Sequence, residues 1–124
     1  MEERDPLTSL VIGAAIEVHR VIGPGLLESV YQACLEEELR SRNVDFLSQH
    51  RLPVIYKGKP LKNEFVLDFY LPNELVIELK TVEALLPVHE AQLLTYLRLS
   101  QTKRGLLLNF NVSVLKDGIR RMVL

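Results

Sequence analysis

The chain has 124 residues, 48% of them hydrophobic, which fits one globular domain over residues 1–124 and excludes two full cores. Its 15 basic and 16 acidic side chains give a net charge of −1, which excludes a general polyanion binder and leaves any nucleic-acid contact to a local patch. Cys34 is the only cysteine, the acidic N-terminus does not resemble a signal peptide and no apolar run reaches ~20 residues, so we expect a cytoplasmic protein without an internal disulfide or a membrane span.

Two helices are predicted in the first third of the chain. The first begins at Asp5-Pro6, where an N-cap residue precedes a proline, and ends before Gly23-Pro24-Gly25. Its apolar residues recur at helical spacing: Leu7, Leu10, Val11, Ala14, Val18 and Val21. The second helix follows with the apolar stripe Leu27, Val30, Tyr31, Cys34 and Leu35.

From residue 45 the pattern changes to that of strands. Residues 45–56 end at the turn Lys57-Gly58-Lys59, and residues 64–71 are rich in β-forming side chains. Pro72-Asn73 predicts a tight turn into a strand over residues 75–80. The strands 64–71 and 75–80 are apolar on both faces, which is typical of the centre of a sheet.

The last third of the chain predicts a helix and two more strands. Residues 88–101 form the helix and residues 105–112 an apolar strand. Asp117-Gly118 predicts a hairpin turn into an edge strand over residues 119–124. The order α-α-β-β-β-α-β-β predicts an α/β (α+β) domain, with a mixed central sheet flanked by helices.

Three charged residues interrupt the two central strands. Alternation along a strand predicts one common face for Val66, Asp68 and Tyr70, and one for Val76, Glu78 and Lys80. A hairpin at Pro72-Asn73 would let Asp68 face the same cleft as Glu78 and Lys80. Buried charges cost several kcal/mol each unless they are paired or bind metal, and Mg²⁺ takes carboxylate oxygens.

This set of residues suits metal-assisted hydrolysis of a phosphodiester. Asp68 and Glu78 would hold the metal, and Lys80 would orient or deprotonate the attacking water. An ordinary Glu78–Lys80 pair on a half-exposed strand is the alternative. On the residues alone both interpretations stay open.

A family resemblance bears on this choice. The segment Gly25-Leu26-Leu27-Glu28-Ser29-Val30-Tyr31 resembles the pattern that names the GxxExxY family of the PD-(D/E)xK nuclease-like superfamily. The segments 22–25, 108–112 and 116–118 are also similar to this family, so the resemblance covers roughly residues 8–124. It implies a restriction-endonuclease-like core of order α-β-β-β-α-β, with an extra N-terminal helix and C-terminal strand. It also implies that Asp68 and Glu78-Leu79-Lys80 hold the superfamily's metal and lysine positions.

The resemblance suggests further site residues. Glu28 would complete the metal site, as a helix glutamate does in related nucleases, and the Leu79 carbonyl would be another ligand. The alternative for Glu28 is a surface residue favoured by the helix dipole. Gln92 and Tyr96, one helical turn apart, are similar to a motif of RecB-like nucleases and would contact the substrate, Gln92 also assisting catalysis. The alternative there is one polar residue beside a core tyrosine.

Three other positions qualify this picture. Tyr31, the last residue of the family pattern, is a further candidate for substrate contact. His19 lies on an apolar helix face, where a hydrogen-bonded core residue is usual, although some RecB-like enzymes carry a helix histidine near the metal. Leu67 stands before Asp68 where the superfamily name has proline, and Phe65 stands where the RecB-like pattern has glycine, which weakens a close analogy to RecB-like enzymes.

The sequence therefore predicts a Mg²⁺- or Mn²⁺-dependent nuclease that acts on DNA or RNA. The apolar 119–124 segment at a sheet edge predicts a homodimer or larger homo-oligomer. One alternative function is a catalytically silent nucleic-acid-binding or assembly module on the same fold. Another is a metal-dependent phosphohydrolase of small nucleotides.

Overall fold

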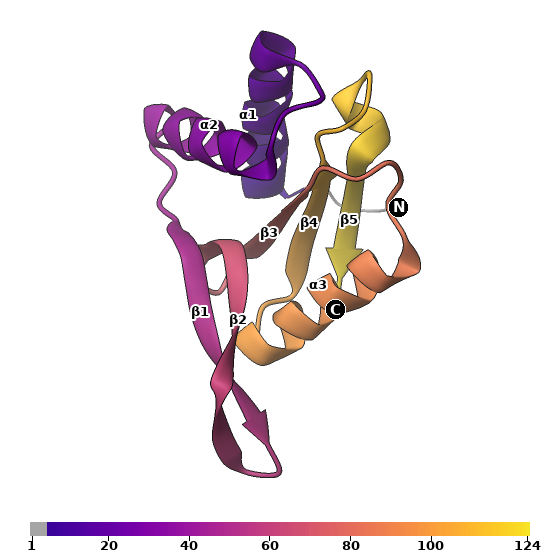
Figure 1. Ribbon diagram of the computed structural model, residues 1–124. Helices are drawn as coiled ribbons and strands as arrows, with labels where there is room; N and C mark the ends of the chain where they lie inside the picture. The colour runs from indigo at the N-terminus through magenta and orange to yellow at the C-terminus, as the bar shows by residue number, and fades with distance from the viewer. Residues whose placement is uncertain (1–4) are drawn as a thin grey trace.

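The computed structural model describes residues 5–124, and in this range it has three α-helices, a short 3₁₀ helix and five strands (Figure 1). The helices are α1 (Pro6–Ile22), α2 (Glu28–Ser41), α3 (Pro87–Ser100) and the 3₁₀ helix η1 (Leu115–Gly118). The strands are β1 (Leu47–Tyr56), β2 (Lys59–Leu71), β3 (Leu75–Lys80), β4 (Arg104–Asn109) and β5 (Ile119–Val123). The predicted order of helices and strands is confirmed, including the α-β-β-β-α-β core.

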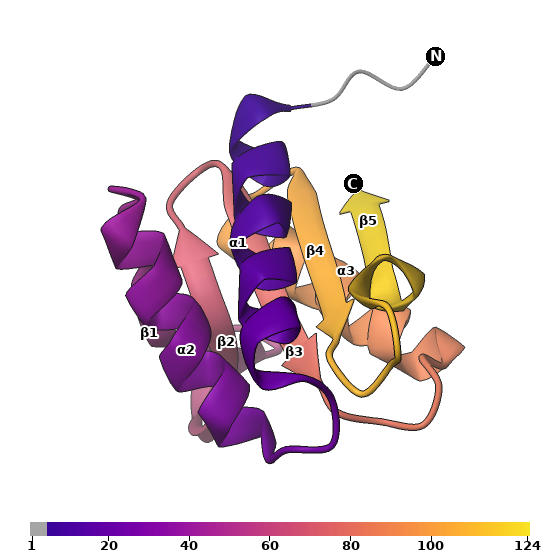
Figure 2. The ribbon, with the colours of Figure 1, turned by 90° about the horizontal axis from the view of Figure 1, so that it is seen from above.

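The strands form one mixed sheet in the order β1-β2-β3-β4-β5. Only β3 and β4 are parallel, because α3 connects them as a crossover; the other neighbours are antiparallel. Helices α1 and α2 cover one face of the sheet and α3 covers the other (Figure 2). The predicted central position of β2 and β3 explains why their side chains are apolar on both faces.

Each face of the sheet has its own hydrophobic cluster. The cluster under α1 and α2 includes Tyr31, Phe69, Ile77 and Phe110. The cluster under α3 includes Leu67, Val76, Tyr96 and Leu107. None of the helices in residues 5–124 has the length and hydropathy needed to cross a bilayer.

The ends of the first helix follow the predicted signals. The Asp5 carboxylate accepts a hydrogen bond from the Thr8 N–H at 3.0 Å, and Pro6 occupies the first turn. The helix ends at Gly23, whose φ of 73° favours glycine.

Strands β1 and β2 form a longer hairpin than predicted. Strand β2 begins at Lys59 and not at Glu64, because Lys57 and Gly58 both have positive φ and make a two-residue turn that pairs Tyr56 with Lys59. We call residues 50–66 the hairpin arm. Its end projects beyond the helices and the rest of the sheet (Figure 1).

Strict alternation along β2 is wrong at Asp68. Leu67 packs in the α3-side cluster, whereas Phe69, two residues on, packs in the cluster under α1 and α2. Gln49 lies opposite Asp68, between the pairs Ser48–Phe69 and His50–Leu67, and has a φ of 50°. The hairpin therefore changes face at Asp68 and Gln49, and Val66 does not share a face with Tyr70 as predicted.

The C-terminal turn also differs from the prediction. Asp117-Gly118 is not a two-residue hairpin turn but lies in η1, and β4 ends at Asn109 rather than Val112. A Cβ at Gly118 would collide with the Asn109 carbonyl oxygen, so glycine is needed there for close approach and not for a turn. The prediction of β5 as an edge strand is confirmed.

Candidate active site

The candidate site lies where β2 and β3 separate. Their pairing ends at Phe69 and Ile77, and the next pair in register would be Asp68 and Glu78. There, Glu78 Oε2 accepts a hydrogen bond from the Asp68 backbone N–H at 2.8 Å. In return, Asp68 Oδ2 accepts one from the Leu79 backbone N–H at 2.8 Å. Each carboxyl group thus takes the place of a backbone carbonyl that would accept this N–H in regular strand pairing. These two hydrogen bonds hold the carboxyl groups close to each other.

Burial makes this pair of carboxyl groups costly to ionise. Glu78 is 4% exposed, and burial, together with the charge of Asp68, raises its pKa to about 9. Burial also raises the pKa of Asp68, against the hydrogen bonds from Leu79 and from the side chain of Gln49. Nearby positive charge would therefore favour the ionised pair.

Lys80 supplies one positive charge at this site. Its charge acts to lower the pKa of Asp68, Glu78 and Glu28, although burial outweighs it in all three. Its ammonium donates a hydrogen bond to Gln92 Oε1 at 3.0 Å, which ties β3 to α3. Within residues 5–124 no ion pair joins Lys80 to Glu78, so the geometry does not match a simple structural pair.

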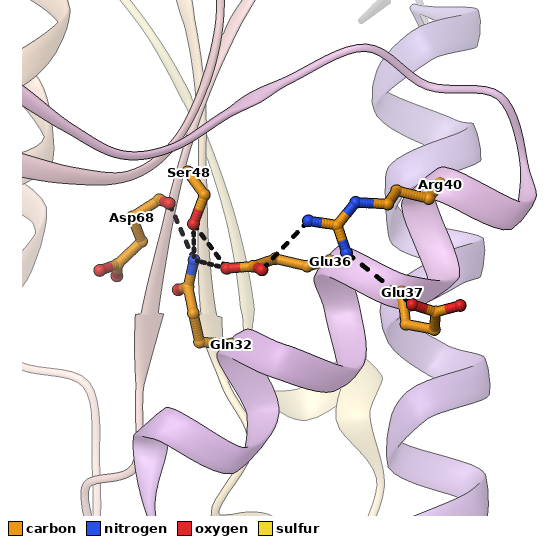
Figure 3. Close-up of polar contacts among 6 residues, drawn as sticks. All are labelled: Gln32, Glu36, Glu37, Arg40, Ser48 and Asp68. Atoms are coloured by element: carbon orange, nitrogen blue, oxygen red, sulfur yellow. Dashed lines mark hydrogen bonds and ion pairs between the residues drawn. The ribbon is translucent and has the colours of Figure 1, made fainter.

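Glu28 reaches the site from the other side of the sheet. It is the first residue of α2, and burial followed by the charge of Asp68 raises its pKa. One turn along α2, Gln32 Nε2 donates to the Asp68 carbonyl at 3.0 Å and also bonds Ser48 and Glu36 (Figure 3). This contact fixes the helix that carries Glu28 against the strand that carries Asp68.

The acidic side chains do not by themselves form a closed ligand set. Across residues 5–124, no three Asp, Glu, His or Cys side chains lie close enough to enclose a metal ion. Asp68 and Glu78 are joined through each other's strand by backbone hydrogen bonds, and Glu28 is near enough for its charge to act on Glu78. A metal here would need backbone, water or substrate oxygens as well.

The two predicted tyrosines are both buried. Tyr31 is completely buried, stacks on Phe110 at 4.5 Å and donates its hydroxyl proton to the Gly23 carbonyl at 2.6 Å. It is therefore a core residue that holds the loop before Glu28, and the expected substrate contact of Tyr31 is wrong. Tyr96 lies on α3 and packs between this helix and the sheet, and its hydroxyl is near enough to Glu78 and Asp68 for their charges to add to the effect of burial in raising its pKa.

His19 occupies the core and not the site. It is buried, and its Nε2 donates to the Val112 carbonyl at 2.8 Å. This matches the usual role of a lone histidine on an apolar helix face.

Sequence reasoning missed three side chains that shape the site. Gln49 Nε2 donates to Asp68 Oδ1 at 3.1 Å, and no sequence pattern marked it. Gln32 lies one helical turn after Glu28, and this spacing is the sequence signal that could have identified it. The Asn109 side chain bonds both the N–H and the carbonyl of Val82, while the Phe110 N–H bonds the Lys80 carbonyl. Asn109 lies in the segment 108–112 that resembles the family, but nothing in that segment predicts that its side chain holds the chain after Lys80.

Comparison with protein families gives a match that spans nearly the whole chain. The model of the PD-(D/E)XK nuclease superfamily matches residues 5–122. The chain belongs to the PD-(D/E)XK nuclease superfamily. Its mixed sheet and helices are consistent with a restriction-endonuclease-like PD-(D/E)XK domain. Comparisons with curated proteins and with solved structures gave no match.

Membership gives the carboxylate pair a context. PD-(D/E)XK nucleases generally use divalent metals such as Mg²⁺ or Mn²⁺. Glu78-Leu79-Lys80 is the only (D/E)-x-K triplet in the sequence. It occupies the buried strand β3, next to Asp68 on β2.

Proposed function

We propose that this protein is a Mg²⁺- or Mn²⁺-dependent nuclease that hydrolyses phosphodiester bonds of nucleic acid. We also propose that it is a GxxExxY member of its superfamily. The observation that carries the proposal is the reciprocal hydrogen bonding of Asp68 and Glu78 where β2 and β3 separate, with Lys80 beside them. A buried pair of carboxyl groups is costly to a fold and is typical of a site that receives a cation.

The donor set fits a hard divalent cation. Asp68 and Glu78 would supply carboxylate oxygens, and Glu28 would approach from α2. The Leu79 N–H points toward Asp68, and in a strand the carbonyl of the same residue points the same way, so the Leu79 carbonyl would be a fourth donor. When bound, such an ion would neutralise the carboxylates and supply Lewis-acid chemistry to a phosphodiester.

The remaining side chains would handle the water and the substrate. Lys80 would orient or deprotonate the attacking water with its ammonium or amine group. Gln92 holds the Lys80 ammonium at 3.0 Å and is exposed, so it could also donate to a phosphate oxygen. Tyr96, on the face of α3 that packs on the sheet, would contact the substrate.

One structural observation favours a second candidate function. One oxygen of each carboxyl group, Asp68 Oδ2 and Glu78 Oε2, already accepts a backbone N–H group. A site that stays closed in this way would leave a nucleic-acid-binding or assembly module without turnover. The nuclease is the better proposal because the module gives no reason for a lysine held beside these carboxyl groups.

The deciding experiment is cleavage of labelled nucleic acid. Single- and double-stranded DNA and RNA would be incubated with the protein and Mg²⁺, Mn²⁺ or EDTA. We expect cleavage with metal, loss of cleavage in Asp68→Asn, and wild-type cleavage in Asp117→Asn, an exposed aspartate in η1. Metal-dependent binding without cleavage would select the module. Cleavage of mononucleotides alone would select a small-nucleotide phosphohydrolase.

Two further parts of the proposal concern the setting of the protein. We infer a cytoplasmic protein from its lone cysteine, and a homodimer or larger homo-oligomer from its outermost strand β5. Val123 and Leu124 are exposed at the end of that strand, next to Arg120 and Arg121. Light scattering at micromolar concentration should give more than the monomer mass of 14.2 kDa. A monomer mass would contradict the oligomer.

A further inference from the structure

The hairpin arm carries a charge opposite to that of the rest of the protein. Residues 50–66 contain four cationic side chains, Arg51, Lys57, Lys59 and Lys62, and one acidic side chain, Glu64. The arm is therefore +3, and because the chain is −1 the remaining residues carry −4. Arg51 pairs with Glu64 at 3.6 Å, whereas the three lysines form no ion pair within residues 5–124. The arm is thus a concentrated basic surface. A second group of cationic side chains, Lys103, Arg104, Lys116, Arg120 and Arg121, lies on and near β4 and β5.

The arm is connected directly to the candidate active site. Strand β2 runs without interruption from Lys59 near the tip to Asp68 at the site. At ~3.3 Å per residue, Lys62 lies up to about 20 Å and Lys59 up to about 30 Å from Asp68 along the strand. In B-form DNA these distances correspond to roughly six to nine base pairs.

The base of the arm is held firmly. Phe65 packs edge-on against Tyr96 at 5.8 Å, and the His50 ring stacks on Tyr70 at 5.0 Å. Leu52 also packs against the cluster under α3. Because these contacts anchor the base of the arm to the α3 side of the sheet, the arm has a fixed direction relative to the site.

The outer part of the arm has no packing of its own. Ile55, Tyr56 and Leu61 are all exposed, with Tyr56 at 61%. A two-stranded ribbon outside the body of a domain gains little stability from such residues. Lysines beside an exposed aromatic ring are instead typical of surfaces that contact nucleic-acid backbone and bases.

We propose that the hairpin arm binds the phosphodiester backbone of the nucleic acid that flanks the scissile bond. This inference rests on the proposed function, since it assigns the arm to the same substrate. Lys57, Lys59 and Lys62 neutralise phosphates at increasing distance from Asp68, and Tyr56 contacts a sugar or a base at the tip. The arm lets a chain of net negative charge hold a polyanion near its acidic site.

The test is binding of nucleic acid across a range of salt concentrations. Labelled 30-mers of single- and double-stranded DNA and RNA would be titrated in Ca²⁺ or EDTA, so that binding is separated from cleavage. The triple variant Lys57→Gln, Lys59→Gln, Lys62→Gln should weaken binding of the preferred 30-mer about tenfold and lower the slope of log K against log salt by about 2–3. Tyr56→Ala should weaken binding with the slope unchanged.

The matched control removes three charges elsewhere. Lys103, Lys116 and Arg120 are exposed near β4 and β5, at the opposite side of the sheet from β1. Their triple glutamine variant should bind as the wild type does. Equal loss in both triple variants would mean a net-charge effect and would overturn the proposal, as would wild-type binding and slope in the arm variant.

Cleavage separates this proposal from the proposed function. With a short oligonucleotide that does not reach the arm, the arm variant should cleave at the wild-type rate, while its cleavage of the 30-mer at low concentration should fall. Arm-dependent binding in a wild type that never cleaves would support the arm and contradict the nuclease. Cleavage of the 30-mer that is unaffected by the arm variant would contradict the arm and leave the nuclease standing.

Discussion

At the scale of single residues, the site depends on two carboxyl groups that perform backbone functions. Asp68 and Glu78 each accept an N–H that strand pairing would otherwise satisfy. Glu78 is the more deeply buried of the two, and its pKa of about 9 follows from burial and from the adjacent Asp68. The metal-free protein therefore stores an electrostatic cost at this position.

That cost predicts an unusual pH dependence of stability. Between the unfolded pKa of 4.5 and the folded pKa of about 9, the unfolded chain loses the Glu78 proton while the native protein retains it. Rising pH therefore favours unfolding over this window. In EDTA, Glu78→Gln should remove this fall of stability with pH. At pH 9 its free energy of unfolding, measured with urea, should exceed that of the wild type by about 2–4 kcal/mol. The exposed Glu74→Gln is the control, and parallel curves for all three proteins would contradict the assignment.

Substitution of Lys80, also a single residue, distinguishes a catalytic role of this lysine from a purely structural one. If it handles the water, Lys80→Ala should lower turnover by ~10²–10⁴-fold while metal still binds. Lys80→Arg should also be poor, because a guanidinium does not deprotonate and has another shape. Cleavage rate, metal affinity and melting temperature would be measured on each protein, with the exposed Lys116→Ala as control. A Lys80→Ala protein with full activity and only lower stability would refute the catalytic role.

At the scale of elements, the site is assembled by contacts between helices and strands. Gln32 joins α2 to the Asp68 carbonyl, Lys80 joins β3 to Gln92 on α3, and Asn109 joins β4 to the segment after Lys80. The loop that Tyr31 closes against Gly23 sets where α2 begins, and so where Glu28 lies. Each element thus delivers one group, and the hydrogen bonds between them set the spacing.

Gln32 tests this view. Gln32→Ala removes the contact with Asp68 and should cost about 1 kcal/mol of stability, the usual value of one hydrogen bond. Because Glu28 and Asp68 would no longer be held in place, metal affinity should fall, with a drop in kcat larger than the change in KM. Glu37→Ala, an exposed change on the same helix, is the control. Unchanged metal affinity in Gln32→Ala would show that the contact supports only the fold.

At the scale of the whole molecule, a body of net charge −4 carries the hairpin arm of net charge +3, and the arm joins the body beside Asp68. Two hydrophobic clusters lie one on each face of the sheet, and the candidate site lies between them, where the pairing of β2 and β3 ends. A divalent cation at this point would stabilise the folded protein by mass action, because the unfolded chain does not bring the carboxylates together.

The metal response of the whole fold is therefore a direct measurement of the site. Mg²⁺ or Mn²⁺ should raise the melting temperature of the wild type, while Asp68→Asn and Glu78→Gln should lose most of this increase. Asp117→Asn should respond as the wild type does. Equal increases in all four proteins would mean that the ion binds elsewhere.

Much of this protein could be predicted from local sequence signals. Asp5-Pro6 and the turn at Gly23 bound the first helix, and the doubly apolar strands around Asp68 and Glu78 predicted a central hairpin with charges inside it. These features depend on neighbours along the chain, through capping, φ preferences and the period of apolar side chains. For the same reason the order of elements was predictable.

What only the tertiary structure decided involves residues far apart in the sequence. Strict alternation predicted the faces of β2, but Gln49 and Asp68 break it together, and Leu67 and Phe69 then pack on opposite sides of the sheet. Tyr31 had the position of a site residue and became a core residue, because Phe110 and the Gly23 carbonyl are available to it only in the fold. Local preferences determined the elements, whereas packing and hydrogen bonds across the sheet determined which side chains reach the site.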